Sequence, residues 1–207
     1  MNAIALGERY ARTRYELFKW RYHLAESKKL VLALSMAGLM AVLAQVRIAL
    51  PWTPIPITGS TFGAIFAGVL LGNMWGGISV LLYIVLGLAG LPVFTGFKGG
   101  TAVLLGPTAG YLLGFAVTAF LIGYITDTYE KSRKFLTLFC LMLASSAIIL
   151  ALGSICLGIW LGAVKGQGVS LGEILWMGFI PFIPGDIIKS FIAALVAVSI
   201  IPKESYK

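Results

Sequence analysis

The chain has 207 residues, of which 59% are hydrophobic and 12% are charged, and its mean hydropathy is +0.95. A soluble domain of this size needs far more charge to cover its surface, so the composition excludes an ordinary soluble protein. Apolar residues also gather in runs of roughly 20, the length that crosses a bilayer as a helix. We therefore predict an all-α membrane protein.

The predicted elements begin with a polar, basic arm at residues 1–29, which contains seven lysines and arginines. Residues 30–207 are expected to form one transmembrane domain of six helices. The six spans are predicted at about Leu30–Leu50, Thr58–Leu71, Trp75–Leu91, Pro107–Thr126, Phe135–Val164 and Pro184–Ile201. A short interfacial segment at residues 171–180 is expected before the last span.

Two connections between these spans differ from simple linkers. The proline loop, residues 51–58, holds three prolines and is expected to be stiff and extended. The glycine loop, residues 91–100, is rich in glycine and is expected to be flexible. It carries one cation, Lys98.

The distribution of lysine and arginine predicts the orientation of the chain. With the amino terminus inside, 12 of the 16 lie on the arm, the loop at 131–134 or the carboxyl terminus. This is the positive-inside pattern, and it predicts that both termini are cytoplasmic. The net charge of +8 then reports topology, and no motif for nucleic-acid binding accompanies it. The arm can also lie on anionic membrane lipid, with Trp20 and Tyr22 at the interface.

Enzymatic and metal-binding signatures are missing from the sequence. There is no G-x-x-x-x-G-K-[S/T] motif, so any step driven by ATP needs another chain. His23 is the single histidine and lies in the basic arm. Cys140 and Cys156 lie in one predicted helix, roughly 24 Å apart at 1.5 Å per residue, so they cannot form a disulfide with each other. We predict no catalytic residue, no metal site and no cofactor.

Three ionisable residues lie within predicted spans, where they are costly and by default indicate a pathway or a ligand site. They are Arg47, at the end of the first span, and Asp186 and Lys189, near the start of the sixth. The alternative is an ion pair that only holds helices together. Asp186 and Lys189 share one helix face just after Pro184, where free N–H groups can also bind an anion. Apolar walls for such a site could come from Trp52, Phe94, Tyr111 and Phe182.

Four ordered motifs carry a resemblance to a known family. They are the P-x-P-x-T segment at 54–58, Gly-Leu-Pro-Val-Phe at 90–94, Gly-Pro-Thr-Ala-Gly-Tyr-Leu at 106–112, and Ile-Pro-Gly-Asp-Ile-Ile-Lys at 183–189. From Leu30 to Ile201 the chain resembles the BioY family, the biotin-binding S components of energy-coupling-factor (ECF) transporters. One departure is Ser60, where the family usually has glutamine.

The resemblance implies an S-component-like fold in the cell membrane and a pocket that faces outward. It implies that the pocket binds biotin as a transported ligand, with Asp186 and Lys189 in contact with it. Lys98 and Thr108 or Tyr111 are expected beside them, and Thr58 and Trp52 complete the expected set. Sequence reasoning leaves open whether Lys98 or Lys189 takes the biotin carboxylate. S components for other vitamins, an intramembrane enzyme and a structural subunit are the alternatives.

The first span also carries a stripe of small residues, Ala33, Ala37 and Ala41, spaced four apart. Small residues at this spacing let another helix approach closely, although the pattern is common in membrane helices. Gly106, Gly110 and Gly114 repeat it here. The resemblance implies that the alanines contact the transmembrane coupling protein of the transporter, which works with two ATPase subunits.

Overall fold

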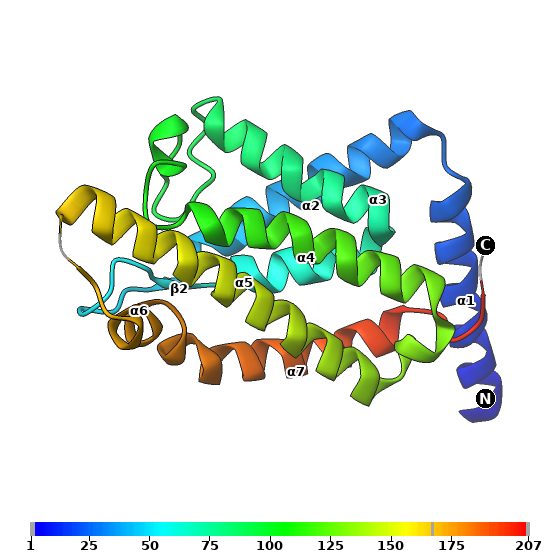
Figure 1. Ribbon diagram of the computed structural model, residues 1–207. Helices are drawn as coiled ribbons and strands as arrows, with labels where there is room; N and C mark the ends of the chain where they lie inside the picture. Colours follow the sequence, from blue (N-terminus) through cyan, green and yellow to red (C-terminus); the bar gives the residue numbers. More distant parts are fainter. Residues whose placement is uncertain (1–2, 167, 206–207) are drawn as a thin grey trace.

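The computed structural model describes residues 3–166 and 168–205, and it is mostly helical (Figure 1). The helices are α1 (Ala3–His23), α2 (Glu26–Gln45), α3 (Ser60–Leu88), α4 (Ala109–Thr128), α5 (Phe135–Lys165), α6 (Leu171–Gly178) and α7 (Ile183–Ile200). Three 3₁₀ turns lie at η1 (Thr101–Val103), η2 (Glu130–Arg133) and η3 (Ile180–Phe182). Strands β1 (Arg47–Ile48) and β2 (Ile57–Thr58) pair antiparallel and frame the proline loop.

Within residues 3–166 and 168–205, four helical segments are long and apolar enough to cross a membrane: α2, α4, α5 and the run Leu171–Ile200 that contains α6 and α7. The two halves of α3, Ser60–Gly72 and Met74–Leu88, are apolar but shorter. The predicted first span is displaced, since α2 begins at Glu26 and ends at Gln45 instead of Leu50. It ends there because Val46 is extended and the next residues pair with β2. The domain division at residue 29 stays a prediction.

The chain reverses direction in the middle of α3, in agreement with the prediction that one span ends at Leu71 and the next begins at Trp75. Gly72 has φ 81°, which glycine adopts without strain. A Cβ at this position would lie 2.3 Å from Oδ2 of Asp127, so the turn also packs too tightly for a side chain. Gly76 lies against Gly68, where a Cβ would come within 2.6 Å of the Gly68 Cα. The two halves of α3 therefore form a helical hairpin with almost no loop.

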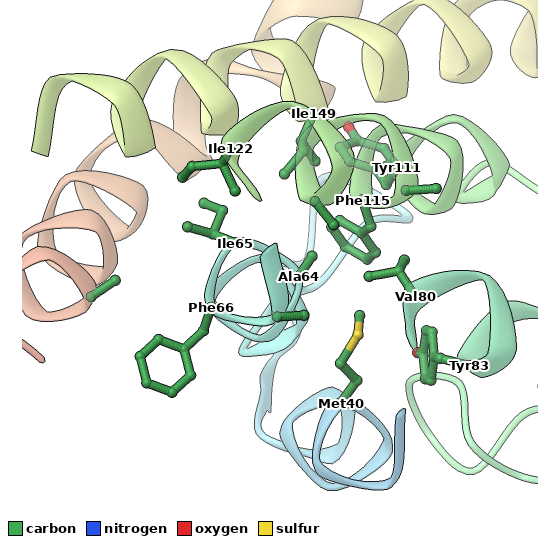
Figure 2. Packing of buried hydrophobic residues seen from close by; sticks show 14 of the residues in the cluster. Met40, Ala64, Ile65, Phe66, Val80, Tyr83, Tyr111, Phe115, Ile122 and Ile149 are labelled. Carbon is green, nitrogen blue, oxygen red and sulfur yellow. The ribbon is translucent and has the colours of Figure 1, made fainter. Parts of the chain in front are cut away.

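The core lies between α2, the α3 hairpin and α4. Met40 of α2, Ala64 of the first half of α3 and Val80 of the second half are fully buried and point toward one another (Figure 2). The first half of α3 is buried on almost every side, whereas α5 and α7 leave long apolar faces open, including Ile155 and Ile188. Apolar residues on the outside of a bundle belong to a protein surrounded by lipid. The chain is a multi-pass membrane protein.

The bundle has two distinct ends (Figure 1). The cavity end carries the proline loop, the glycine loop, α6 and the first turn of α7. At the arm end, α1 crosses the bundle at a steep angle. The sequence predicts only a basic arm there, but the structure shows a helix whose Phe18 is buried and whose Trp20 and Tyr22 are largely exposed.

Arginines hold the arm end together by binding the last turns of three helices. The last carbonyls of a helix have no partner within it and carry partial negative charge. Arg21 donates to the carbonyl of Leu70 in the first half of α3, Arg133 to Thr126 of α4 at 3.0 Å, and Arg14 to Val198 of α7 at 3.1 Å. Arg133 also donates to the carbonyls of Pro202 and Glu204, at 3.2 and 2.6 Å. Each of the three helices thus has an arginine at its end.

Candidate functional site

A cavity of about 530 Å³ opens at the cavity end of the bundle. This volume lies in the range of small-molecule sites, which is about 300–1,000 Å³. Its wall comes from both loops, from β1 and β2, and from the first turns of α3, α4 and α7. Phe115, Leu150 and Phe182 supply apolar surface, while threonines and charged groups lie among them. The site can therefore hold a molecule with both apolar and polar parts.

Asp186 and Lys189 form the polar centre of this cavity. Lys189 Nζ donates to Asp186 Oδ1 at 2.7 Å, because the two residues are three apart on the first turns of α7. Asp186 is only 3% exposed, and its second oxygen, Oδ2, is buried without a hydrogen-bond partner. A buried carboxylate oxygen without a partner is rare and costly in a folded protein. The arrangement is suited to a ligand that donates a hydrogen bond.

The cavity has a positive electrostatic character from two sources. Arg47, Lys98 and Lys189 line it together with one carboxylate, that of Asp186. In addition, α3, α4 and α7 all begin at its wall, and the amino-terminal end of a helix carries partial positive charge. None of these three helices has a side-chain cap hydrogen bond. The site can therefore also accept an anionic group.

Thr108 and Tyr111 line the cavity at the start of α4. The Tyr111 hydroxyl donates to the carbonyl of Gly178 at 2.7 Å, and this bond ties α4 to the end of α6. The Tyr111 ring lies over Gly153, where a Cβ would come within 2.3 Å of the ring, and its centroid lies 6.3 Å from that of Phe182. Tyr111 thus forms part of the cavity wall, and its hydroxyl proton is already donated to a group of the same chain.

Thr58 and Ser60 line the cavity where β2 passes into α3. Ser60 is buried, and the Tyr83 side chain lines the same region from the second half of α3. A serine leaves more room here than the glutamine expected from the resemblance to the BioY family. Tyr83 was not among the residues predicted for the site, and the reversal at Gly72 brings it back to the cavity.

The proline loop is fixed to α6 by one threonine. The Thr53 hydroxyl donates to the carbonyl of Met177 at 2.7 Å and accepts from the Ile55 amide at 3.2 Å. Ile55 is buried, whereas Trp52 is 50% exposed and is not among the residues that line the cavity. The structure thus brings six of the seven predicted binding residues around one cavity and leaves Trp52 outside it. Their contact with a ligand stays a prediction.

The glycine loop contributes a further part of the cavity wall. Its Phe94 is buried, packs edge-on against Tyr83 with ring centroids 5.4 Å apart, and lies over Gly87. The backbones of Phe94 and Lys98 exchange two hydrogen bonds of 3.0 and 3.2 Å. The segment forms a hydrogen-bonded turn, and the flexibility expected from its glycine content stays a prediction.

Arg47 and Gln45 are two further residues at or beside the site that sequence reasoning left out of the binding set. Arg47 had a signal, its charge near a span, and it lines the cavity from β1. Gln45, the last residue of α2, binds the glycine loop through its side-chain amide. The available signal was an amide at the end of an otherwise apolar run.

The structure places the predicted docking residues of the first span largely inside the chain, and their contact with a coupling protein stays a prediction. Ala33 and Ala37 are 0% and 2% exposed, and Ala41 is partly buried against the core. The partner of this small-residue face is the chain's own α3, whose Gly63 lies against Met40. The spacing correctly indicates close helix packing, but the neighbour lies within the same chain.

Comparison with known proteins identifies the family. The model of the BioY family matches residues 15–205. This chain belongs to the BioY family. A probable biotin transporter BioY of Methanothermobacter thermautotrophicus is 46% identical over 143 residues, which cover 68% of this chain and 90% of that protein. The biotin transporter BioY of Thermotoga maritima is 38% identical over 150 residues, covering 72% and 83%.

A solved structure extends the likeness from sequence to fold. The crystal structure of the S component for biotin from an ECF-type ABC transporter matches with a TM-score of 0.73 and 30% identity. The match covers 84% of this chain and 93% of that one. The resemblance found from the motifs is therefore confirmed, including the S-component fold. Membership of this family also confirms a transport protein rather than an enzyme.

Proposed function

We propose that this BioY-family chain is the membrane subunit that captures biotin for uptake by an ECF-type transporter. Biotin is its transported ligand rather than a resident cofactor. The observation that carries the proposal is the unpartnered Oδ2 of Asp186, buried in a positively charged cavity of suitable size. The relatives named as biotin transporters give that cavity its ligand.

The chemistry of biotin fits the groups that line the cavity. The ureido ring has N–H donors for Asp186 Oδ2 and a carbonyl that can accept from Lys189. The fused rings and aliphatic chain need apolar walls, which Phe115 and Phe182 can supply. The carboxylate needs a cation. We assign it to Lys98, with Arg47 nearby, since Lys189 is already paired with Asp186 at 2.7 Å.

The proposed arrangement in the cell membrane has six crossings, with both termini in the cytoplasm. The two halves of α3 provide the second and third crossings. The arm end, with most of the lysines and arginines, then faces the cytoplasm in agreement with the positive-inside rule. The cavity opens to the outside, where an uptake protein meets its ligand.

The energy for uptake comes from other chains in this proposal, namely a transmembrane coupling protein and two ATPase subunits. The buried alanines leave a different face of α2 free, which contains Leu34, Gly38 and Val42. A Cβ at Gly38 would meet nothing within 4 Å. We expect Gly38→Trp to abolish ATP-dependent uptake without changing biotin binding. Gly162→Trp is the matched control, because Gly162 on α5 is equally open.

Isothermal titration of the purified, detergent-solubilised chain tests the function directly. We expect one biotin to bind per chain. Thiamin and riboflavin should release little or no heat. The same is expected of lipoic acid, which has a carboxylate on an apolar chain but no ureido ring. Binding of thiamin or riboflavin in place of biotin would assign the protein to another vitamin. No binding of any of them would contradict a capture function.

A further inference from the structure

Gln45 makes an unusually complete set of hydrogen bonds between α2 and the glycine loop. Its Oε1 accepts from the amides of Gly96 and Phe97, both at 3.1 Å. Its Nε2 donates to the carbonyl of Phe94 at 3.2 Å and to that of Ala41 at 3.1 Å. One side chain thus binds three backbone groups of the turn between Phe94 and Lys98.

The turn that Gln45 binds has a backbone that a free chain would avoid. Gly96 and Phe97 have φ of 76° and 57°, and Phe97 is the one residue other than glycine with positive φ in the part of the chain described here. A bulky side chain rarely adopts this region, so its conformation must be held by its surroundings. The Phe97 ring is 72% exposed and has little packing to hold it. The hydrogen bond from its backbone amide to the Gln45 side chain supplies the restraint.

The restrained turn carries part of the cavity wall. Gly96 and Phe97, whose amides donate to Gln45, have cavity-lining residues on either side. These are Phe94, Thr95, Lys98 and Gly99. Arg47 lies against Gly96, where a Cβ would come within 2.4 Å of Nη1, so the same turn also places a second cation of the cavity. A change in the turn would also move Lys98, because Lys98 follows Phe97 directly and pairs with Phe94 across the turn.

We propose that Gln45 is a positioning residue, which holds the glycine loop and Lys98 over the cavity. Its amide is suited to this role because it offers an acceptor to two converging N–H groups and donors to two carbonyls. The effect on ligand retention rests on the proposed function, whereas the effect on the loop does not. A second consequence is that the loop is fixed to the end of α2, so a movement of α2 would be passed to the cavity wall.

Amide hydrogen exchange of the ligand-free protein tests the first part. We expect Gln45→Met to accelerate exchange at Gly96 and Phe97 at least tenfold, because both amides lose their acceptor. In Gln45→Glu one carboxylate oxygen can still accept from both amides, but the other faces the carbonyls of Phe94 and Ala41 with no proton to donate, so exchange should accelerate less than in Gln45→Met. Ser199→Ala is the control, since the Ser199 hydroxyl bonds only to its own helix, to Leu195 and Val196. Unchanged exchange in Gln45→Met would overturn the proposal.

The dissociation rate of biotin tests the second part. Gln45→Met should release biotin at least tenfold faster than wild type, while Ser199→Ala should release it at the wild-type rate. Faster exchange at the two amides with unchanged biotin dissociation would overturn the role in retention. Should wild-type protein fail to bind biotin at all, the proposed function fails, and the exchange measurement still decides whether Gln45 holds the loop.

Discussion

Cations lie at both ends of the same three helices, although the partial charges of the two helix ends have opposite sign. At the arm end, the last turns of α3's first half, α4 and α7 carry partial negative charge, and Arg21, Arg133 and Arg14 bind their carbonyls. At the cavity end the same helices begin, and their partial positive charge meets further cations, Arg47, Lys98 and Lys189. Cations that stabilise one end are therefore unfavourable at the other.

The difference separates structural charges from those that await a ligand. The arginines of the arm end have backbone acceptors within the chain. At the cavity end one carboxylate, with one of its oxygens unpartnered, faces three cations. A protein keeps such an arrangement where function requires it, at a cost in stability. The predictions below test this separation, since each end should respond to mutation in its own way.

The largest expected effect is at the arm end, on stability alone. Arg133 is buried and donates to Thr126, Pro202 and Glu204. Arg133→Met should lower the free energy of unfolding by about 3 kcal/mol, because charged hydrogen bonds are lost and buried carbonyls stay unpaired. Thermal unfolding in detergent measures this. Biotin affinity of the folded protein should stay within about twofold. Lys131→Met, in the same turn but exposed, is the control.

The next effect is at the cavity end, on binding alone. Asp186→Asn and Lys189→Ala should each weaken biotin binding at least tenfold, about 1.4 kcal/mol. Asparagine can still accept from Lys189, so the unfolding temperature of Asp186→Asn should change little. Asp127→Asn is the matched control, since Asp127 pairs with Arg21 at 3.5 Å at the arm end. Wild-type affinity in a double mutant of Asp186 and Lys189 would remove both residues from the site.

A smaller effect is expected where the cavity end has a purely structural bond. Tyr111→Phe removes the hydroxyl that donates to Gly178 and keeps the ring. The free energy of unfolding should fall by about 1 kcal/mol, the net contribution of one hydrogen bond. Biotin affinity should fall by no more than about threefold, because the aromatic wall remains. A tenfold loss of affinity, measured by titration, would mean that the hydroxyl contacts the ligand.

The smallest effect is expected at Trp52, which the sequence places in the site and the structure places beside it. Trp52→Ala should leave both biotin affinity and the unfolding temperature close to wild type, because the side chain is half exposed and outside the cavity wall. Thr53→Val, one residue further, removes the hydrogen bond that anchors the proline loop to Met177. It should lower biotin affinity clearly more than Trp52→Ala does. Equal affinities for these two variants would contradict the loop anchor.

The sequence predicts those features that depend on the cost of a residue in lipid. Long apolar runs predict the spanning helices, and the expense of Asp186 and Lys189 in a membrane predicts the centre of the cavity. Features that depend on neighbours distant in sequence were not predictable. The alanine stripe predicts close packing, but nothing local says that α3 supplies the partner. That Trp52 lies beside the cavity wall could not be read from the sequence, because the Thr53 bond that holds the proline loop goes to α6, far along the chain.

The shortness of α3's first half has a consequence for the depth of the site. At 1.5 Å per residue, Ser60–Gly72 is about 20 Å long, against a hydrocarbon layer of about 30 Å. Gly72 lies at the arm end beside Asp127, and Ser60 lines the cavity. With Gly72 at the boundary of the hydrocarbon layer and the helix along the membrane normal, Ser60 lies about 10 Å below the opposite surface. The part of the cavity wall at Ser60 is then within the hydrocarbon layer, and the buried first half of α3 lies between it and the arm end.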